Sequence, residues 1–243
     1  YTYQNTNILG YGYYTNNPPA GAFRGFGVCQ SEYALEMLID RLAEMVGISP
    51  WEIRFRNAIE PGKVLPNGQI ADCSTALKET LLAVKDVYEA HPGRAGIACA
   101  LKNAGVGVGL PDKGRARAEV LDGKLRVYTA ASDIGQGCRT VFTQILQSET
   151  GLPIEKLSIS RGSTEDSPDS GTTSGSRQTL ITGEAVRGLA AEVKKDLDAA
   201  GGKLEELNGK EYFYEFFDPT DKLGADLPNP KSHVAYAFAT NVA

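Results

Sequence analysis

The sequence predicts an α+β protein in which mixed sheets pack with helices. Two observations lead to this class. Apolar residues recur at steps of three and four in several segments, which is typical of amphipathic helices, and alternate or cluster over strand length in others. The two kinds of segment do not follow a regular strand–helix–strand repeat, so a doubly wound fold is not expected. With 42% hydrophobic residues over 243 positions, the chain can bury a sizeable core.

The first ninety residues are expected to form an opening strand and three helices. Residues 1–14 are rich in tyrosine and strand-like. Residues 31–46 have an apolar face opposite an acidic one, Leu35, Leu38, Leu42 and Met45 against Glu32, Glu36, Asp40 and Glu44. Ser49, Pro50 and Glu52 supply an N-cap, a first-turn proline and a capping-box glutamate, which predict a second helix to about residue 58. Helical spacing over residues 74–90 predicts the third.

Beyond Gly93 the pattern changes to strands mixed with helices. Strands are expected at 96–102, 115–121 and 124–130, and Asp122-Gly123 predicts a hairpin between the last two. Further expected elements follow in order: a helix at 140–150, a strand at 157–160, a helix at 183–200, and strands at 212–217 and 234–242.

Composition argues against several classes of protein. A net charge of −5 without a cluster of Lys and Arg argues against nucleic acid as a partner. Apolar runs are shorter than the roughly 20 residues that cross a bilayer, so no membrane span is expected. The four cysteines form no C-x-x-C pair and there are two histidines, so a metal held by protein side chains is not expected. Scattered cysteines and no signal peptide favour the cytoplasm.

Three glycine-rich loops each precede a predicted helix, at residues 21–27, 133–137 and 171–177. Such a loop presents backbone N–H groups and the positive end of a helix dipole, which suits an anionic group. One loop of this kind is usually an ordinary turn, whereas three without a competing catalytic motif favour binding. The chain has no G-x-x-x-x-G-K-[ST], H-E-x-x-H, G-x-S-x-G or EF-hand motif.

These loops carry a resemblance to a known family. The matching segments are 16–19 (Asn-Asn-Pro-Pro), 22–27 (Ala-Phe-Arg-Gly-Phe-Gly), 133–137 (Asp-Ile-Gly-Gln-Gly), 174–177 (Ser-Gly-Ser-Arg) and 183–186 (Gly-Glu-Ala-Val). In this order and spacing they resemble the molybdenum-cofactor-binding subunit of the xanthine dehydrogenase and aldehyde oxidase family. The resemblance implies a partial molybdenum cofactor-binding domain, with residues 1–92 ending a first subdomain and residues 93–243 forming part of a second.

The resemblance also implies a reaction and its cofactors. Members hydroxylate an N-heterocycle or an aldehyde with oxygen derived from water. The molybdenum is held by molybdopterin, in some members as the cytosine dinucleotide, and not by protein side chains. Iron–sulfur clusters and FAD, on partner domains or subunits, carry the electrons away.

By resemblance, Phe23 and Arg24 lie beside the oxo groups of the metal, with Gly25 in the same loop, and Phe26 flanks the substrate ring. Gln136 is expected to donate a hydrogen bond to an oxo ligand, while Gly135 and Gly137 allow close approach of the backbone. The phosphates of the pterin side chain are assigned to Ser174, Gly175 and Ser176. Two alternatives stay open, namely that Arg24 forms a structural ion pair and that Phe26 belongs to the core.

The chain departs from the family pattern in ways that limit its expected function. The family's catalytic glutamate lies in a Gly-Glu motif, and no such motif occurs after Val186. The position near Gly105 is not aromatic, unlike in purine-oxidising members, so a small ring or an aldehyde is as plausible a substrate as a purine. Tyr1 is not a methionine and the last residues resemble an unfinished strand, so we expect a fragment that is inactive alone and needs the remaining subunit sequence.

Two other functions stay open at this stage. The chain could be a non-catalytic pterin-binding or assembly module of the same fold. It could also be an unrelated scaffold in which the glycine loops are coincidental. A Gly-Glu motif in flanking sequence, or the molybdenum content of the complete protein, would separate these from the enzyme.

Overall fold

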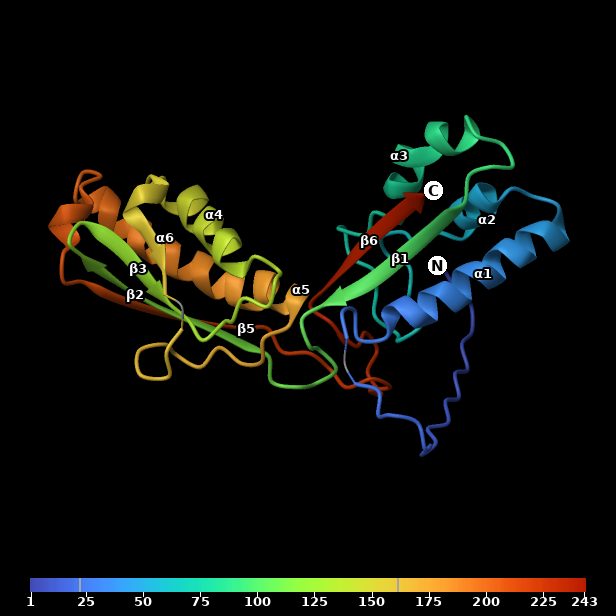
Figure 1. Cartoon of the computed structure of the whole chain (residues 1–243), viewed down its shortest axis with the longest axis horizontal. Coiled ribbons are helices and arrows are strands. Elements are labelled where there is room, and N and C mark those ends of the chain that lie inside the picture. Colours follow the sequence, from blue (N-terminus) through green and yellow to red (C-terminus); the bar gives the residue numbers. More distant parts are fainter. Residues whose placement is uncertain (22, 161) are drawn as a thin grey trace. The chain divides into compact units, whose positions relative to one another are not determined.

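The computed structural model describes residues 1–21, 23–160 and 162–243 and divides them into two compact units (Figure 1). The first unit consists of residues 1–103 and 221–243, and the second of residues 104–220. The helices and strands confirm the α+β class. The C-terminal residues join the first unit because β6 pairs with β1. The subdomain boundary expected between residues 92 and 93 stays a prediction.

The first unit packs three helices with a two-stranded sheet. The helices are α1 (Val28–Val46), α2 (Pro50–Asn57) and α3 (Leu77–Glu89), and the strands are β1 (Ile97–Ala104) and β6 (Ala235–Val242). Gly96 and Ala243 exchange both backbone hydrogen bonds, at 2.8 and 3.1 Å. Trp51 lies in the core, and its indole N–H donates to the Leu81 carbonyl at 3.0 Å. This core holds α2 and α3 together.

The second unit is a four-stranded sheet with two long helices on one face (Figure 1). Its strands β2 (Lys113–Leu121), β3 (Lys124–Tyr128), β4 (Leu157–Ile159) and β5 (Glu211–Phe217) lie in the order β4-β3-β2-β5. The helices are α4 (Cys138–Thr150) and α6 (Gly183–Ala199). Core residues from helices and sheet, among them Phe142, Leu189 and Val120, are almost completely buried.

A continuous helical stretch leads into α6. It starts with the single turn α5 (Gly175–Arg177), continues as a π-helical segment (Gln178–Thr182) and joins α6 directly. Two short 3-10 helices, Ile154–Lys156 and Leu204–Leu207, complete the unit. π-helical turns are rare and concentrate at functional sites, so this stretch is a candidate for ligand binding.

Most expected elements are confirmed, and the reasons are local. Ser49 accepts a hydrogen bond from the Glu52 amide at 3.0 Å, as an N-cap should. Asp122 and Gly123 have φ values of 52° and 68°, the left-handed conformation of a tight hairpin turn, and β2 and β3 pair antiparallel around them.

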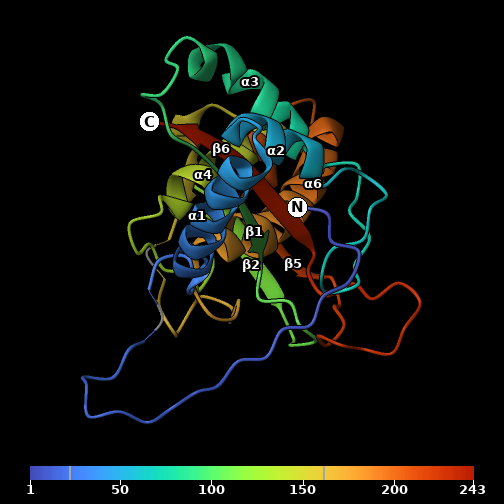
Figure 2. The same cartoon turned by 90° about the vertical axis from the view of Figure 1, so that its right-hand side faces the viewer.

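The prediction of a strand in residues 1–14 is wrong. No residue of this described segment belongs to a strand. Tyr1 and Thr2 bond to Glu36 and to the Asn57 carbonyl, and the chain then runs as an extended loop away from the helices of its unit (Figure 2). Ile8 is 85% exposed and Tyr13 81% exposed. Alternating side chains form a strand only when a neighbouring strand takes up the backbone hydrogen bonds, and within the described residues this segment has no such neighbour.

The orientation of α1 also differs from what its apolar periodicity suggests. Glu36 is 7% exposed and faces the unit, whereas Leu38 and Met45 are 61% and 72% exposed. The helix is amphipathic as predicted, but its acidic face is the one that packs. None of the described helices is long and apolar enough to cross a membrane.

Candidate functional site

The first glycine loop is a tight, left-handed turn ahead of α1. Gly25, Phe26 and Gly27 have φ values of 94°, 52° and 88°, and the Phe26 amide donates to the Phe23 carbonyl at 2.8 Å. A left-handed conformation is unfavourable for an aromatic residue such as Phe26, and strain of this kind concentrates at functional sites. Gly25 and Gly27 are needed because side chains would be strained at their φ values.

The side chains of this loop point into solvent. Phe23 and Phe26 are 84% and 64% exposed, so Phe26 is not part of the core of its unit. Arg24 is exposed and has no ion pair within residues 1–21, 23–160 and 162–243. The alternative assignments of Phe26 to the core and of Arg24 to an ion pair therefore gain no support from this structure.

The second loop, residues 133–137, is closed by its own side chains. The Asp133 carboxylate accepts from the amides of Gly135 (3.0 Å) and Gly137 (3.3 Å). Gln136 accepts from the Ile134 amide at 2.6 Å through Oε1 and donates to the Ser132 carbonyl at 3.0 Å through Nε2. The expectation that these three backbone amides are free for an anion is therefore wrong, because a carboxylate and an amide oxygen already occupy them.

The two glycines of this loop serve the backbone conformation. Gly135 and Gly137 have φ values of 101° and 74°, which favour glycine. A Cβ at either position would meet no described atom within 4 Å, so the space outside the loop is open. The loop thus presents an accessible backbone surface, with Gln136 half-buried at its centre.

The third loop leads into the helical stretch that continues as α6. Ser174 is the N-cap residue, and among the described residues its side chain accepts no capping hydrogen bond. Gly175 and Ser176 are exposed, and Ser174 is half-buried. The first N–H groups of a helix have no partner inside the helix, so the start of this stretch can donate to a ligand.

The structure joins the second and third loops. Thr173 accepts through Oγ1 from the Ser132 amide at 3.1 Å and from Gln178 Nε2 at 2.9 Å. Gln178, which is completely buried, in turn accepts from Thr182 Oγ1 at 2.5 Å. This chain of hydrogen bonds brings the Gln136 loop and the Ser174–Ser176 segment together within the second unit. The residues of the first loop belong to the first unit.

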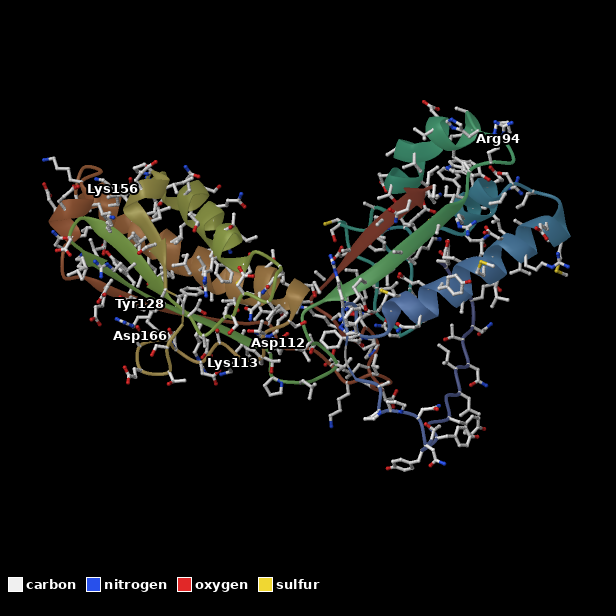
Figure 3. The ribbon with its side chains drawn as sticks, in the orientation of Figure 1. Arg94, Asp112, Lys113, Tyr128, Lys156 and Asp166 are labelled. Carbon is white, nitrogen blue, oxygen red and sulfur yellow. The ribbon has the colours of Figure 1, made fainter. Side chains whose placement is uncertain are left out.

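Arg177 connects the third loop to the start of β2. It donates through Nη2 to the Lys113 carbonyl at 2.6 Å and through Nε to Asp112, and Figure 3 labels these two partners where β2 begins. Glycine is favoured at position 171 by its φ of 74°, and a Cβ there would also lie 2.5 Å from Arg177 Nη2 and 3.3 Å from the Lys113 carbonyl oxygen. Arg177 Nη1 is buried and has no partner among the described atoms. The roles of Arg177, Asp112 and Thr173 were not visible in the sequence, because Arg177 binds Asp112 and Lys113 across 65 and 64 residues and Thr173 binds Ser132 across 41.

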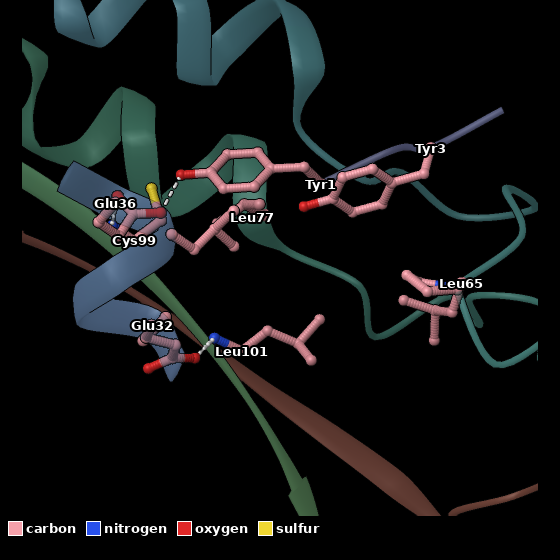
Figure 4. Close-up of a pocket in the computed structure, with 11 residues that line it drawn as sticks. Tyr1, Tyr3, Glu32, Glu36, Leu65, Leu77, Cys99 and Leu101 are labelled. Atoms are coloured by element: carbon pink, nitrogen blue, oxygen red, sulfur yellow. Dashed lines mark hydrogen bonds between the residues drawn. The ribbon is translucent and has the colours of Figure 1, made fainter. Parts of the chain in front are cut away.

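A cavity of about 210 Å³ occurs in the first unit (Figure 4). Two carboxylates line it, and both already accept hydrogen bonds from within the unit. Glu32 accepts from the Leu101 amide at 2.6 Å and Glu36 from the Tyr1 hydroxyl at 2.5 Å. Burial raises the pKa of Glu32 and that of the Cys99 thiol. None of the predicted site residues lines this cavity, and its walls are mostly apolar, so it is not the candidate active site.

The described residues contain no group of three or more His, Cys, Asp and Glu side chains that could hold a metal ion. The donors of the candidate site are instead backbone N–H groups, hydroxyls and the side-chain amide of Gln136. These groups suit an anionic ligand with several oxygen atoms.

Comparison with known proteins identifies a family. Two models of the molybdopterin cofactor-binding domain match residues 1–58 and 70–223. The aldehyde oxidoreductase of Megalodesulfovibrio gigas is 34% identical over 217 residues, covering 83% of this chain and 24% of the relative. A putative xanthine dehydrogenase molybdenum-binding subunit of Escherichia coli is 32% identical over 201 residues, covering 76% of this chain and 27% of the relative.

A solved structure agrees. The aldehyde oxidoreductase from Desulfovibrio gigas aligns with a TM-score of 0.72 and 28% identity, over 91% of this chain and 27% of that one. This chain thus spans about a quarter of the length of its relatives. The chain belongs to the molybdopterin cofactor-binding family of the xanthine dehydrogenases and aldehyde oxidoreductases.

Proposed function

We propose that this chain forms one part of a molybdenum hydroxylase that oxidises an N-heterocycle or an aldehyde. The observation that carries the proposal is the hydrogen-bonded junction of the second and third loops through Thr173. An accessible glycine loop beside a helix start, whose first N–H groups have no partner inside the helix, supports a binding site there. Membership of the family supports molybdopterin as the ligand.

The donor set of the second unit fits the cofactor's phosphate. Ser174, Gly175 and Ser176 would hold it with amides and hydroxyls, and Arg177, whose charge is paired with Asp112, would fix the position of this segment. Gly135 and Gly137 would let the pterin approach the backbone closely, because the space beside them is open. The cytosine dinucleotide form would extend the same anionic group.

When bound, the cofactor supplies the two-electron oxidation of a substrate carbon, with oxygen from water. Gln136 would orient the cofactor. Its Nε2 carries two hydrogens, of which one donates to the Ser132 carbonyl, so the other can donate outward. Phe23 and Arg24 would contact the cofactor, and the exposed ring of Phe26 would flank the substrate.

The rest of the reaction would depend on other parts of the enzyme. This chain has no Gly-Glu motif after Val186, so the general base would come from the remaining molybdenum-subunit sequence. Iron–sulfur clusters and FAD on partner domains or subunits would carry the electrons away. The chain alone would be inactive, and the assembled enzyme would act in the cytoplasm on a small molecule such as a nicotinate-like ring, a purine or an aldehyde.

A second candidate is a non-catalytic pterin-binding or assembly module of the same fold. Such a module would not need the Gly-Glu motif, because binding does not need a base. Both candidates require the second and third loops to bind the cofactor, and they differ in turnover by the complete protein.

Cofactor content tests the binding that both candidates share. The complete protein that contains this chain would be produced in a host that makes molybdopterin. Molybdenum would be measured by elemental analysis, and pterin by fluorescence after oxidation. Gln136→Ala and Ser176→Ala should lower pterin retention at least fivefold, whereas Gln147→Ala and Ser148→Ala, exposed positions on α4, should not change it. Wild-type protein without molybdenum and pterin would overturn the proposal.

Activity separates the two candidates. Wild-type protein with bound cofactor would be assayed with purine, nicotinate and aldehyde panels in the presence of an artificial electron acceptor. Turnover of any of these substrates supports the hydroxylase, and stoichiometric cofactor without turnover supports the binding or assembly module.

A further inference from the structure

Helix α1 is fixed to its unit by its acidic face. Glu36 accepts from Arg54 Nε at 2.7 Å and from the Cys99 amide at 2.8 Å. Glu32, one helical turn earlier, accepts from the Leu101 amide, and Asp40, one turn later, from Arg54 Nη1 at 2.7 Å. Rotation of the helix about its axis would break these bonds and leave the completely buried Arg54 without its partners.

A second face of α1 is apolar and exposed. We call it the apolar stripe; it consists of Leu35, Leu38, Leu42, Met45 and Val46. Their exposed fractions are 36%, 61%, 49%, 72% and 61%. Of the 19 residues of α1, all of them described, only Glu36 and Ala43 are buried. A continuous apolar surface along a helix marks an interaction site, because its exposure to water is unfavourable.

We propose that the apolar stripe binds a helix from the part of the molybdenum-binding polypeptide that lies outside this chain. This inference rests on the proposed function. The relatives are about four times as long as the matched region, since it covers 24% and 27% of two of them. The additional chain in a polypeptide of that length has apolar surface of its own that must be buried.

The geometry of the stripe favours a helix as its partner. Leu35, Leu38, Leu42 and Met45 are separated by steps of three, four and three residues, the spacing of ridges that pack into the grooves of a second helix. The stripe contains no charged residue, whereas the ion pair between Arg41 and Glu44, 2.6 Å apart, lies at the exposed surface beside it. An apolar contact with a polar rim is typical of protein interfaces.

Oxidation of methionine offers a direct test, because the chain has two methionines and both lie on α1. Met45 belongs to the apolar stripe, and Met37, which is 55% exposed, does not. Oxidation by hydrogen peroxide would be followed by mass spectrometry in the isolated chain and in the complete molybdenum-binding protein. Met45 should oxidise at least tenfold more slowly in the complete protein, and Met37 should change less than threefold. Equal Met45 rates in both samples would overturn the proposal.

Substitutions provide an independent measurement. Leu38→Glu with Leu42→Glu should leave the isolated chain folded, since both side chains are exposed, but should lower the yield of soluble complete protein at least tenfold. Tyr33→Glu with Met37→Glu, exposed positions off the stripe, should keep the wild-type yield. A wild-type yield for the stripe variant contradicts the inference. If the isolated chain forms dimers that the stripe variant abolishes, and Met45 is unprotected in the complete protein, the partner is a second copy of this chain. That result would overturn the proposal.

The outcome is separable from that of the proposed function. Protection of Met45 in a complete protein that contains neither molybdenum nor pterin would support the interface and contradict the cofactor assignment. Bound cofactor with unprotected Met45 would support the cofactor assignment and contradict the interface.

Discussion

Arg177 and Asp112 form an ion pair at 2.5 Å in which both side chains are almost completely buried, with 1% and 2% exposed. The other oxygen of Asp112 accepts from the Val106 amide at 2.7 Å. Since Arg177 also binds the Lys113 carbonyl, the pair ties the start of β2 to the segment that carries Ser174, Gly175 and Ser176. The position of the candidate phosphate-binding residues thus depends on a contact between residues 65 positions apart.

Arg177→Met should lower the free energy of unfolding by about 3–5 kcal/mol, because it leaves the Asp112 carboxylate buried without its partner. Urea denaturation of the chain measures this loss. The matched control is Arg187→Met, since the pair of Arg187 with Glu184 is half exposed and such pairs contribute little. Arg177→Met combined with Asp112→Leu should be more stable than Arg177→Met alone. Equal losses for Arg177→Met and Arg187→Met would show that the buried pair is not needed.

Gly114→Ala should destabilise the second unit, because β2 and the π-helical segment approach each other at this glycine. A Cβ there would lie 2.3 Å from the Ile181 carbonyl oxygen, and backbone cannot move aside as a flexible side chain could. We expect a loss of about 1–3 kcal/mol or more in the free energy of unfolding. Gly175→Ala is the control, since its Cβ would meet no described atom within 4 Å. A Gly114→Ala variant as stable as the control would contradict the close approach.

Ser49→Ala should lower the stability of the first unit through its effect on α2. The Ser49 side chain accepts from the Glu52 amide, and the loss of an N-cap costs about 1 kcal/mol. Ser49→Asp keeps a capping oxygen and should restore the wild-type midpoint of thermal unfolding. If the alanine and aspartate variants unfold at the same temperature, the cap does not stabilise the helix.

The sequence predicted those elements that depend on neighbouring residues. Ser49 and Pro50 determine where α2 begins, and Asp122-Gly123 determines the hairpin between β2 and β3. Both signals act within a few residues of the chain. The strand expected in residues 1–14 failed for the opposite reason, since a strand forms only when a distant segment pairs with it.

Helical periodicity predicted the existence of α1 but not its orientation. The apolar stripe and the acidic face were both visible in the sequence. Which of them packs depends on Arg54 and on the amide of Cys99, 63 residues from Glu36, both of which donate to the Glu36 carboxylate. Buried carboxylates are stable only with such partners. The sequence alone therefore did not show that α1 packs through the face that carries four acidic residues.

The candidate site was predictable only in part, for a similar reason. Glycine content and the resemblance indicated the loops that contain Gln136 and Ser174, and these assignments stay predictions. The contacts that join the loops were not visible, because Thr173 meets Ser132 across 41 residues. The closure of the second loop by Asp133 could have been foreseen, since aspartate commonly accepts hydrogen bonds from amides two residues further on.

His233→Phe should reduce the loss of stability that acid causes in the first unit. The His233 ring is half-buried, packs edge-on against Tyr236 at 5.5 Å, and has an Nδ1 atom without a partner among the described atoms. Burial, and secondarily the charge of Lys102, lower the pKa of His233 in the folded chain. Above the unfolded value of about 6.5, both states are neutral and the stability contribution is complete. As the pH falls below it, the unfolded chain takes up the proton first, so the free energy of unfolding decreases until the folded histidine is protonated as well.

Phenylalanine keeps the ring contact with Tyr236 and removes the titration. The difference in free energy of unfolding between wild type and His233→Phe would be measured by urea denaturation at intervals from pH 8 to pH 5. It should stay constant above about pH 7 and shift in favour of the variant below it, because only the wild type loses the contribution of His233. Parallel curves over the whole range would mean that the histidine has the same proton affinity in both states and that its burial in the folded unit has no energetic consequence.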